Sequence, residues 1–531
     1  MAKTHVKSAF PSFQIALGLL LLLSLALRFW GLGRFNMLVF DEVYYAKFAN
    51  NYLTQTPFFD GHPPLSKYLI AIGIWIGNRL PIGQDTVNTL TGSTLSTFSY
   101  RWLNALLGSL IPLVVAGIAY QISYRRSFAL LAGYFTALDG LLLVESRYAL
   151  NNVHLLLFGL LGHWCLLLAV NPRVHQQLPW LILSGINFGC SIAIKWNGLW
   201  FLLGVYAIWA IAWIVRFFQH RRPRHLSVAD QLSSASTLSV ADRLTQLSLP
   251  KVMIFLGVLP VVIYSLLWIP HLTLSPDYNF VEVHQQILSY HQRIGGMTPY
   301  ADPNCTPWHK AFFTKTLSAP LCIPKIHPYC SPWLTWIFML RPVVYLYETA
   351  RNTAEPIPVN PPPSPSETQV VYDVHAMGNP ILWWASSIAI VILLVQLGQR
   401  LWRQAVTRTH ETTMTPLPTS EQPVEKATAQ QPVLELWSIG YMLVNYAANL
   451  LPWVRVSRCA FLYHYMGAGV FATLALAWCC DQWLHGDQDS RINTLMLIVF
   501  IILAFIFWLP LYLGLPLSPE AAQLRRLLPT W

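Results

Sequence analysis

The stretch FQIALGLLLLLSLALRFWGLG, residues 13–33, decides the fold class of this chain. A transmembrane helix needs about 20 largely apolar residues, and this stretch supplies them. It is too long for the apolar core of a cleaved signal peptide, and no small-residue cleavage site accompanies it. The sequence therefore predicts a membrane-spanning helix close to the N-terminus.

Runs of the same kind recur along the 531 residues, of which only 11% are charged and 54% are apolar. An ordinary soluble domain contains about 25% charged residues. The composition excludes a soluble globular protein and a disordered protein. It also argues against nucleic-acid binding, in spite of the net charge of +11. We predict an all-α polytopic membrane protein with about eleven transmembrane helices, at approximately 13–33, 98–122, 127–144, 147–169, 178–195, 197–218, 250–270, 380–400, 434–452, 459–481 and 492–513.

Lysine and arginine residues gather on every second connection between these runs. Lys3 and Lys7 precede the first run, Arg125 and Arg126 follow the second, and an arginine cluster lies within 216–251. Because such residues accumulate on cytoplasmic loops, the pattern predicts a cytoplasmic N-terminus and an exterior C-terminus. The net positive charge then reflects the cytoplasmic face.

We expect three regions along the chain. Residues 1–270 form an N-terminal catalytic membrane module with an exterior acidic loop at 34–97. Residues 271–379 form a large exterior loop, and residues 380–531 form a C-terminal membrane module. Within the last region, 401–433 is rich in Thr, Pro, Gln and Glu, which is typical of a disordered linker.

The eight cysteines follow no metal-ligand spacing. Five of them fall in predicted spans, where a free thiol acts as a small apolar group: Cys165, Cys190, Cys459, Cys479 and Cys480. Three lie in the exterior loop, where a disulfide is permitted but cannot include all three: Cys305, Cys322 and Cys330. Motifs of ATP-driven pumps, dinucleotide-dependent enzymes and serine hydrolases are absent from the sequence.

Two acidic clusters stand out on the exterior side. The first contains Asp41 and Glu42, and the second contains Asp60 and His62 just before a short apolar run at 65–77 that we interpret as a re-entrant or interfacial helix. Ionisable groups at membrane depth are costly, so they indicate function. Adjacent carboxylates diverge by about 100° on a helix, so one should act on substrate while the other anchors a loop. The alternative is that both are solvated interfacial acids.

Three cations lie at a matching depth, Arg101, Arg147 and Lys195. Such groups facing a water-filled cavity suit a phosphate. The alternatives are that Glu145 pairs with Arg147 and that Lys195 extends to the interface. A carboxylate base and cations for an anionic leaving group fit an enzyme that acts on a lipid phosphate, and the same groups fit a transporter equally well.

These clusters belong to longer motifs that resemble the protein O-mannosyltransferase family, membrane glycosyltransferases of the GT-C class. The motifs are FDEVYYAKFANNYL (40–53), FFDGHPPLSKYLIA (58–71), YRWLNALLGSLIPL (100–113), ALDGLLLVESRYAL (137–150), SIAIKWNGLW (191–200), HPYCSPWLTWIFMLRPVVYLYE (327–348), GNPILWW (378–384) and LPWVRVSRCAFLYHY (451–465).

The resemblance implies a GT-C fold and inverting transfer of mannose from polyprenyl-phosphate mannose to Ser or Thr hydroxyls of exported polypeptides. It implies that Asp41 is the base supported by Glu42, that Asp60 lies near the acceptor with His62 beside it, and that Arg101 and Lys195 serve the donor side. Other motif residues have roles that the resemblance does not define, namely Glu145, Asn152, His327, Arg341 and His464.

Two departures accompany the resemblance. The family usually has Asp where Asn152 stands, and Gln is common where Glu145 stands. The sugar-binding-like MIR insert of eukaryotic members is absent from 271–379, which points to a bacterial enzyme of the plasma membrane. We expect no obligatory metal or other cofactor, and we expect membrane lipids and the protein-export machinery as further partners. The alternatives are a related glycosyltransferase for another sugar or a lipid acceptor, and a lipid-linked sugar transporter.

Overall fold

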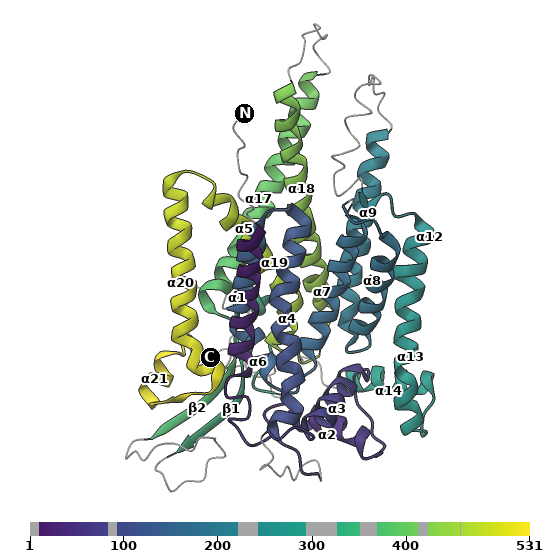
Figure 1. Ribbon diagram of the computed structural model, residues 1–531, viewed down its shortest axis with the longest axis vertical. Coiled ribbons are helices and arrows are strands. Elements are labelled where there is room, and N and C mark those ends of the chain that lie inside the picture. The colour runs from purple at the N-terminus through teal and green to yellow at the C-terminus, as the bar shows by residue number, and fades with distance from the viewer. Residues whose placement is uncertain are drawn as a thin grey trace, which may run out of the picture.

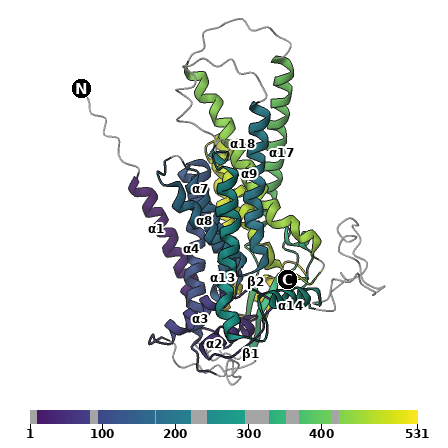
Figure 2. The ribbon, with the colours of Figure 1, turned by 90° about the vertical axis from the view of Figure 1, so that its right-hand side faces the viewer.

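Long apolar helices run side by side through most of the molecule (Figures 1 and 2). The computed structural model describes the chain except residues 1–9, 83–92, 172, 221–242, 294–326, 351–368, 412–422 and 457. Inside its described helices it gives no side-chain description for 10–11, 219–220, 293, 404–411 and 423–435.

The long helices alternate in direction along the bundle, because each is joined to the next by a connection at one end (Figure 1). In chain order they are α1 (Phe10–Phe29), α4 (Thr97–Ser123), α5 (Arg126–Ala137) with α6 (Gly140–Arg147), α7 (Asn152–Ala169), α8 (Gln177–Ile192), α9 (Leu199–His220), α12 (Leu249–Lys251) continuing through a π-helical turn into α13 (Leu259–Leu274), α17 (Pro380–Glu411), α18 (Pro423–Leu450), α19 (Met466–Leu484) and α20 (Gln488–Leu513).

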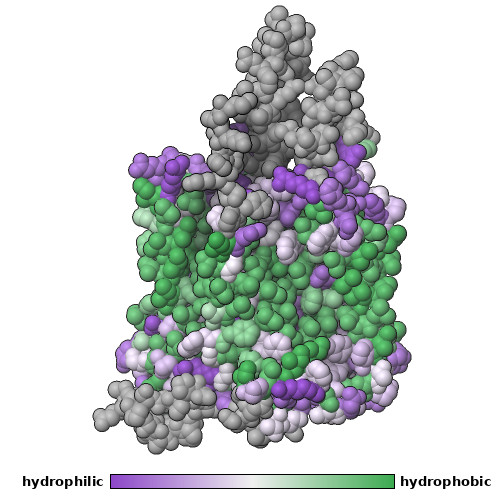
Figure 3. All heavy atoms as spheres, viewed as in Figure 1, coloured by the Kyte–Doolittle hydropathy of each residue, from purple (hydrophilic) through white to green (hydrophobic). Residues whose placement is uncertain are grey.

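Eight helices among the described residues are long and apolar enough to cross a membrane. A ninth span results if α5 and α6, which meet at 58°, are one broken span. The break occurs where Asp139 caps α6 by accepting a hydrogen bond from the Leu142 N–H at 2.7 Å. The apolar surface forms a continuous band between two polar ends (Figure 3). The multi-pass membrane architecture is therefore confirmed. Two further predicted runs correspond to α8 and α18, which are not among the eight, so eleven spans stays a prediction.

The shorter elements gather at the lower end of the molecule in Figure 1, which we call the loop end. They are α2 (Glu42–Leu53), α3 (Leu65–Gly77), α14 (Phe280–Arg293), α16 (Trp333–Trp336), β1 (Val343–Ala350), β2 (Val370–Ala376), β3 (Pro516–Leu517) and α21 (Pro519–Leu524). The C-terminus also lies there, whereas α1 starts at the opposite end (Figure 1). The described residues of the predicted loops 34–97 and 271–379 thus lie on one side, and the predicted short helix at 65–77 is confirmed as α3.

A small antiparallel sheet at the loop end departs from the all-α prediction. Its strand order is β1-β2-β3, with Val343 opposite Ala376 and Ala350 opposite Val370. β1 and β2 are rich in valine and tyrosine, which favour strands. β1 and β2 are eight and seven residues long, so they are too short to be recognised as membrane-spanning runs.

Two further predictions need correction. Cys459 forms a disulfide with Cys330, and it lies in the loop before α19 and not in a span. The predicted disordered linker 401–433 is helical on both flanks, where α17 and α18 continue with residues such as Ala, Gln and Glu that favour helices. Cys165, Cys190, Cys479 and Cys480 are free thiols, as predicted, and Cys305 and Cys322 lie outside the described residues.

Candidate active site

The first acidic cluster lies at the start of α2, where a sharp turn separates the two carboxylates. Phe40 adopts a left-handed backbone conformation with φ +53°, and its ring stacks on Tyr345 at 4.1 Å between centroids. Such strained residues persist where packing holds them and often mark functional sites. Asp41 occupies the N-cap position of α2 and Glu42 is its first residue, so their side chains leave the turn in different directions.

The Glu42 carboxylate is bound by two backbone N–H groups and by Arg101. Its carboxylate accepts hydrogen bonds from the backbone N–H of Val39 and Ala149, both at 2.8 Å, and from Arg101 Nε at 2.9 Å and Nη2 at 2.7 Å. Its side chain is 0% exposed. Glu42 is therefore a loop anchor in this structure, and Asp41 is the carboxylate of this pair that has no such partners among the described residues.

Arg101 is saturated in the same way. Besides its two bonds to Glu42, its guanidinium donates to the carbonyls of Leu32 at 3.1 Å, Phe35 at 2.9 Å and Met37 at 2.7 Å. These contacts use all five N–H groups of an arginine. In this structure no N–H group of Arg101 is left for a ligand, and binding of the donor phosphate by Arg101 stays a prediction.

Arg147 also serves the fold. It is buried, and its guanidinium donates to four carbonyls at the end of α1, those of Leu27, Arg28, Trp30 and Gly31. The last carbonyls of a helix have no partner inside the helix, so a cation there is favourable. Among the described residues Arg147 forms no ion pair with Glu145, and phosphate binding by Arg147 stays a prediction.

Asp41 differs from these groups because its carboxylate accepts no hydrogen bond from the part of the chain that the structure describes. It is half-buried near Lys195 and Asp60. Burial raises the pKa of Asp41 to about 6, the positive charge of Lys195 opposes the rise, and the negative charge of Asp60 adds to it. An unpartnered carboxylate with a pKa near the working pH is suited to general-base catalysis.

Lys195 approaches the same place from the connection between α8 and α9. Its Nζ donates to Asn152 Oδ1 at 2.8 Å and lies 5.4 Å from the centre of the Tyr463 ring. Asn152 in turn donates to the Glu145 carboxylate at 3.1 and 3.2 Å, and Tyr345 donates to that carboxylate as well. Two of the three N–H groups of Lys195 have no partner among the described residues, so they are available to an anion.

The second acidic cluster lies beside the first, under α14. Asp60 pairs with the buried Lys67, which also donates to the His62 carbonyl at 2.9 Å. His291 of α14 lies within 2.9 Å of the Gly61 carbonyl oxygen through Nε2, and its ring lies 5.3 Å from that of His62. His291 and His284 both lie on α14, which covers the second acidic cluster through this contact.

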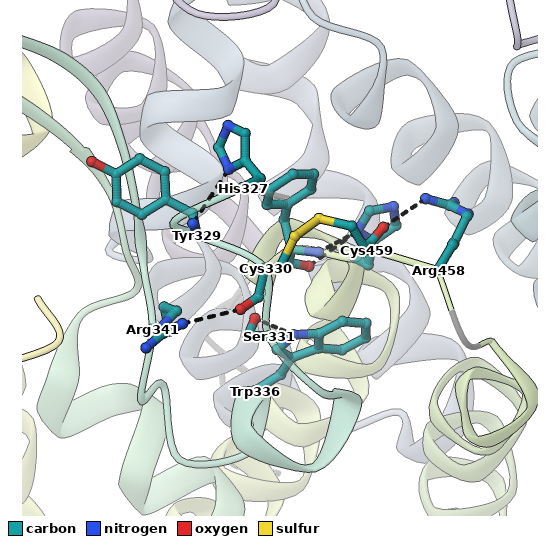
Figure 4. Close-up of a disulfide and its surroundings, with 10 residues drawn as sticks. His327, Tyr329, Cys330, Ser331, Trp336, Arg341, Arg458 and Cys459 are labelled. Atoms are coloured by element: carbon teal, nitrogen blue, oxygen red, sulfur yellow. Dashed lines mark hydrogen bonds between the residues drawn. A yellow bond between two sulfur atoms is a disulfide. The ribbon is translucent and has the colours of Figure 1, made fainter. Parts of the chain in front are cut away.

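The remaining motif residues lie around the Cys330–Cys459 disulfide (Figure 4). The Tyr329 N–H points to His327 Nδ1 at 3.3 Å, and Arg341 donates to the Cys330 carbonyl at 3.3 Å. His464 stacks on Trp336 with 5.9 Å between ring centroids and lies close to Lys195. His464 therefore borders the site, whereas these contacts of His327 and Arg341 fasten the surrounding loop.

Comparison with known proteins agrees with this arrangement. Residues 18–274 match the family model for dolichyl-phosphate-mannose-protein mannosyltransferase, and residues 278–531 match the model for the C-terminal four-transmembrane region of protein O-mannosyltransferase. The chain belongs to the protein O-mannosyltransferase family. Its fold is that of the GT-C glycosyltransferases.

Individual members of the family show how far the similarity extends. The polyprenol-phosphate-mannose–protein mannosyltransferase of Mycolicibacterium smegmatis is 24% identical over 93% of this chain and 87% of its own length. The Mycobacterium tuberculosis protein of the same name is 25% identical over 97% and 91%. The solved Saccharomyces cerevisiae protein O-mannosyltransferase Pmt1-Pmt2 complex bound to the sugar donor superposes with a TM-score of 0.67 at 15% identity, over 98% of this chain and 92% of that one.

Within the protein O-mannosyltransferase family, the departures at Asn152 and Glu145 are related to each other in space. The resemblance places Asp and Gln at these positions, whereas this chain has Asn and Glu, and the two side chains are hydrogen-bonded. One carboxylate and one amide are thus present in either arrangement. The negative charge near Lys195 therefore stands at position 145 in this chain and at position 152 in the pattern of the resemblance.

The sequence reasoning missed Lys67, Tyr345 and Arg458. Lys67 and Arg458 both stand inside motifs that carry the family resemblance. Arg458 is a cation at the exterior side of a predicted span, where positive residues are depleted, and that signal could have found it. No group of three or more His, Cys, Asp or Glu side chains that could hold a metal occurs among the described residues.

Proposed function

We propose that this protein transfers mannose from polyprenyl-phosphate mannose to Ser or Thr hydroxyls of exported polypeptides, with inversion at the sugar. The observation that carries the proposal is the Asp41 carboxylate, unpartnered among the described residues and half-buried beside the Lys195 ammonium in a member of this family. Asp41 supplies a base, and Lys195 supplies a charge for the leaving phosphate.

In this mechanism the acceptor hydroxyl oxygen attacks the anomeric carbon of mannose and gives its proton to Asp41. The bond from the anomeric carbon to the phosphate oxygen breaks on the opposite face, and polyprenyl phosphate leaves with the electron pair. Lys195 neutralises the charge that develops on the phosphate. Glu42 and Arg101 hold the turn that presents Asp41, and Asp60 and His62 border the acceptor side.

The setting follows from the same chemistry. We place the loop end on the exterior face of a bacterial plasma membrane, because the connection between α4 and α5, which holds Arg125 and Arg126 and is predicted to be cytoplasmic, lies at the opposite end of the bundle (Figure 1). Membrane lipids surround the apolar band, and acceptors reach the site as exported polypeptides, presented by the export machinery. We propose that no metal is required, because a lipid phosphate is already an activated leaving group and Lys195 supplies a positive charge.

The test is transfer of mannose by the purified protein in detergent from polyprenyl-phosphate mannose to a Ser/Thr-rich peptide. Mass spectrometry of exported proteins with and without the gene provides the test in cells. Hexose on Ser or Thr that depends on the gene, and that Asp41→Asn abolishes, supports the proposal. Counterflow of the lipid-linked sugar in proteoliposomes without formation of a glycoside would favour the transporter instead.

A further inference from the structure

The phosphate of the donor needs more positive charge than Lys195 alone supplies. All five N–H groups of Arg101 are bonded to Glu42 and to backbone carbonyls, and Arg147 donates to the carbonyls at the end of α1. Lys195 is therefore left as the predicted cation at the site, with two N–H groups free among the described residues. The donor is a phosphate diester with one negative charge, and its departure as a monoester creates a second. A second cation at this point would stabilise the transition state more than the ground state.

Arg458 has the properties that this role demands. It is half-buried in the loop that precedes α19, and its Nη1 donates to the Cys459 carbonyl at 3.1 Å. That bond leaves the other guanidinium N–H groups without a partner among the described residues, and no ion pair to Arg458 is found there. An arginine fork with several free N–H groups is suited to a phosphate.

The charge of Arg458 is directed to the site. The loop that carries Arg458 continues into the turn Leu462–Tyr465, where the Tyr463 ring centre lies 5.4 Å from Lys195 Nζ. The positive charge of Arg458 accordingly lowers the pKa of Lys195. Two like charges near one point are unfavourable until an anion lies between them. Arg458 and Lys195 belong to different parts of the chain, the loop before α19 and the connection between α8 and α9.

The position of Arg458 is set by a covalent link at the next residue. Cys459 is bonded to Cys330, 129 residues away, and the Ser331 N–H donates to the Ala460 carbonyl at 2.8 Å (Figure 4). Ser331 is itself fixed by Trp336, whose Nε1 donates to its hydroxyl at 2.9 Å. Arg458 therefore stands on a loop whose neighbouring residues are fastened to the large exterior segment.

We propose that Arg458 binds the phosphate of the lipid donor together with Lys195, and that the Cys330–Cys459 disulfide positions Arg458 for this contact. The inference rests on the proposed function, since it names a further residue of the same site. It also assigns the disulfide a role as a positioning element that acts through Arg458.

The first experiment measures binding without catalysis. The purified full-length protein in detergent is titrated with polyprenyl phosphate, the product that keeps the phosphate and lacks the sugar. For Arg458→Gln we expect the Kd to rise about 10- to 100-fold, as for loss of a charge-assisted contact. Arg458→Lys should retain part of the affinity. Arg455→Gln, at an exposed arginine three residues earlier, is the matched control and should leave the Kd unchanged. A Kd within twofold of the parent protein for Arg458→Gln overturns the proposal.

The second experiment tests the disulfide. Cys459→Ser and Cys330→Ser are compared with the parent protein for the Kd of polyprenyl phosphate and for the thermal unfolding temperature. We expect both variants to raise the Kd severalfold, and Cys459→Ser in an Arg458→Gln background to add little, because the disulfide acts through Arg458. An unchanged Kd in both cysteine variants, or full additivity with Arg458→Gln, overturns the positioning role.

Mannose transfer separates this inference from the proposed function. If the parent protein transfers mannose and Arg458→Gln leaves both the donor KM and kcat unchanged, the inference fails and the function stands. If the parent protein transfers no mannose but binds polyprenyl phosphate through Arg458, the function fails and the binding role stands.

Discussion

Replacing Arg101 with methionine is expected to destabilise the protein and to leave the intrinsic affinity for the lipid phosphate unchanged. Arg101 and Glu42 are both 0% exposed and are joined by two hydrogen bonds. Removing one partner of a buried ion pair costs about 3–5 kcal/mol, because the other charge stays buried. Glu42 keeps the N–H groups of Val39 and Ala149, so we expect the lower end of that range, about 3 kcal/mol.

The assay is a double-mutant cycle on the free energy of unfolding, measured by SDS titration in mixed micelles with tryptophan fluorescence. Arg101→Met, Glu42→Gln and the double variant are compared. We expect a coupling energy of about 2–3 kcal/mol, because the second substitution removes a charge that the first had already left unpaired. Arg79→Met, at an exposed arginine of the loop end, is the control and should change the free energy by less than about 0.5 kcal/mol.

The opposite pattern would refute the reasoning. If Arg101→Met leaves the free energy of unfolding unchanged and raises the Kd for polyprenyl phosphate at least tenfold, Arg101 binds the donor. The guanidinium contacts described above would then give way to the ligand. The two measurements together distinguish a clamp of the fold from a residue of the phosphate site.

Three further predictions concern the chemistry of the site. Asp41→Asn should lower the rate of mannose transfer by about 10²- to 10⁴-fold, which is the usual contribution of a general base. The Kd for polyprenyl phosphate should stay within twofold of the parent value. Substantial turnover in a folded variant contradicts the assignment of Asp41 as the base. The pH dependence of kcat/KM should be bell-shaped, because burial raises the pKa of Asp41 to about 6 and lowers that of Lys195 to about 8. The rate should fall below about pH 6 as Asp41 is protonated, and above about pH 8 as Lys195 loses its charge. A kcat/KM that is constant from about pH 5 to about pH 9 excludes both roles. Glu145→Gln should reduce the rate of transfer about tenfold, because Lys195 loses the negative charge of Glu145. The double variant Glu145→Gln/Asn152→Asp should restore the rate to within about threefold of the parent protein. An equal loss in both variants would show that the carboxylate must stand at position 145.

Much of the architecture was predictable because membrane insertion depends on local apolar length. The runs at 13–33 and 492–513 need no tertiary information to be recognised, and α1 and α20 are found there. The short apolar run at 65–77 has the bounds of α3 for the same reason. The small sheet was missed because strand pairing joins segments far apart in the chain, β1 with β2 and β2 with β3.

The location of the candidate site was predictable from the sequence, but the role of each charged residue in it was not. Scarce charge in an apolar chain marks Asp41, Glu42 and Lys195 from sequence, since each is costly at membrane depth. The division of labour between adjacent carboxylates also follows from backbone geometry. These arguments concern the cost of placing a charge, which depends on the residue and its immediate surroundings.

The tertiary structure decided which charges are available to a ligand. Arg101 looks like a phosphate ligand in sequence, yet the carbonyls of Leu32, Phe35 and Met37 use its N–H groups, some 64 to 69 residues away along the chain. Cys459 appears to begin a span, yet it pairs with Cys330 beside Arg458. Apolar length is a local and additive property of sequence, whereas the saturation of a hydrogen-bonding group depends on every segment that folding brings within about 3 Å of it.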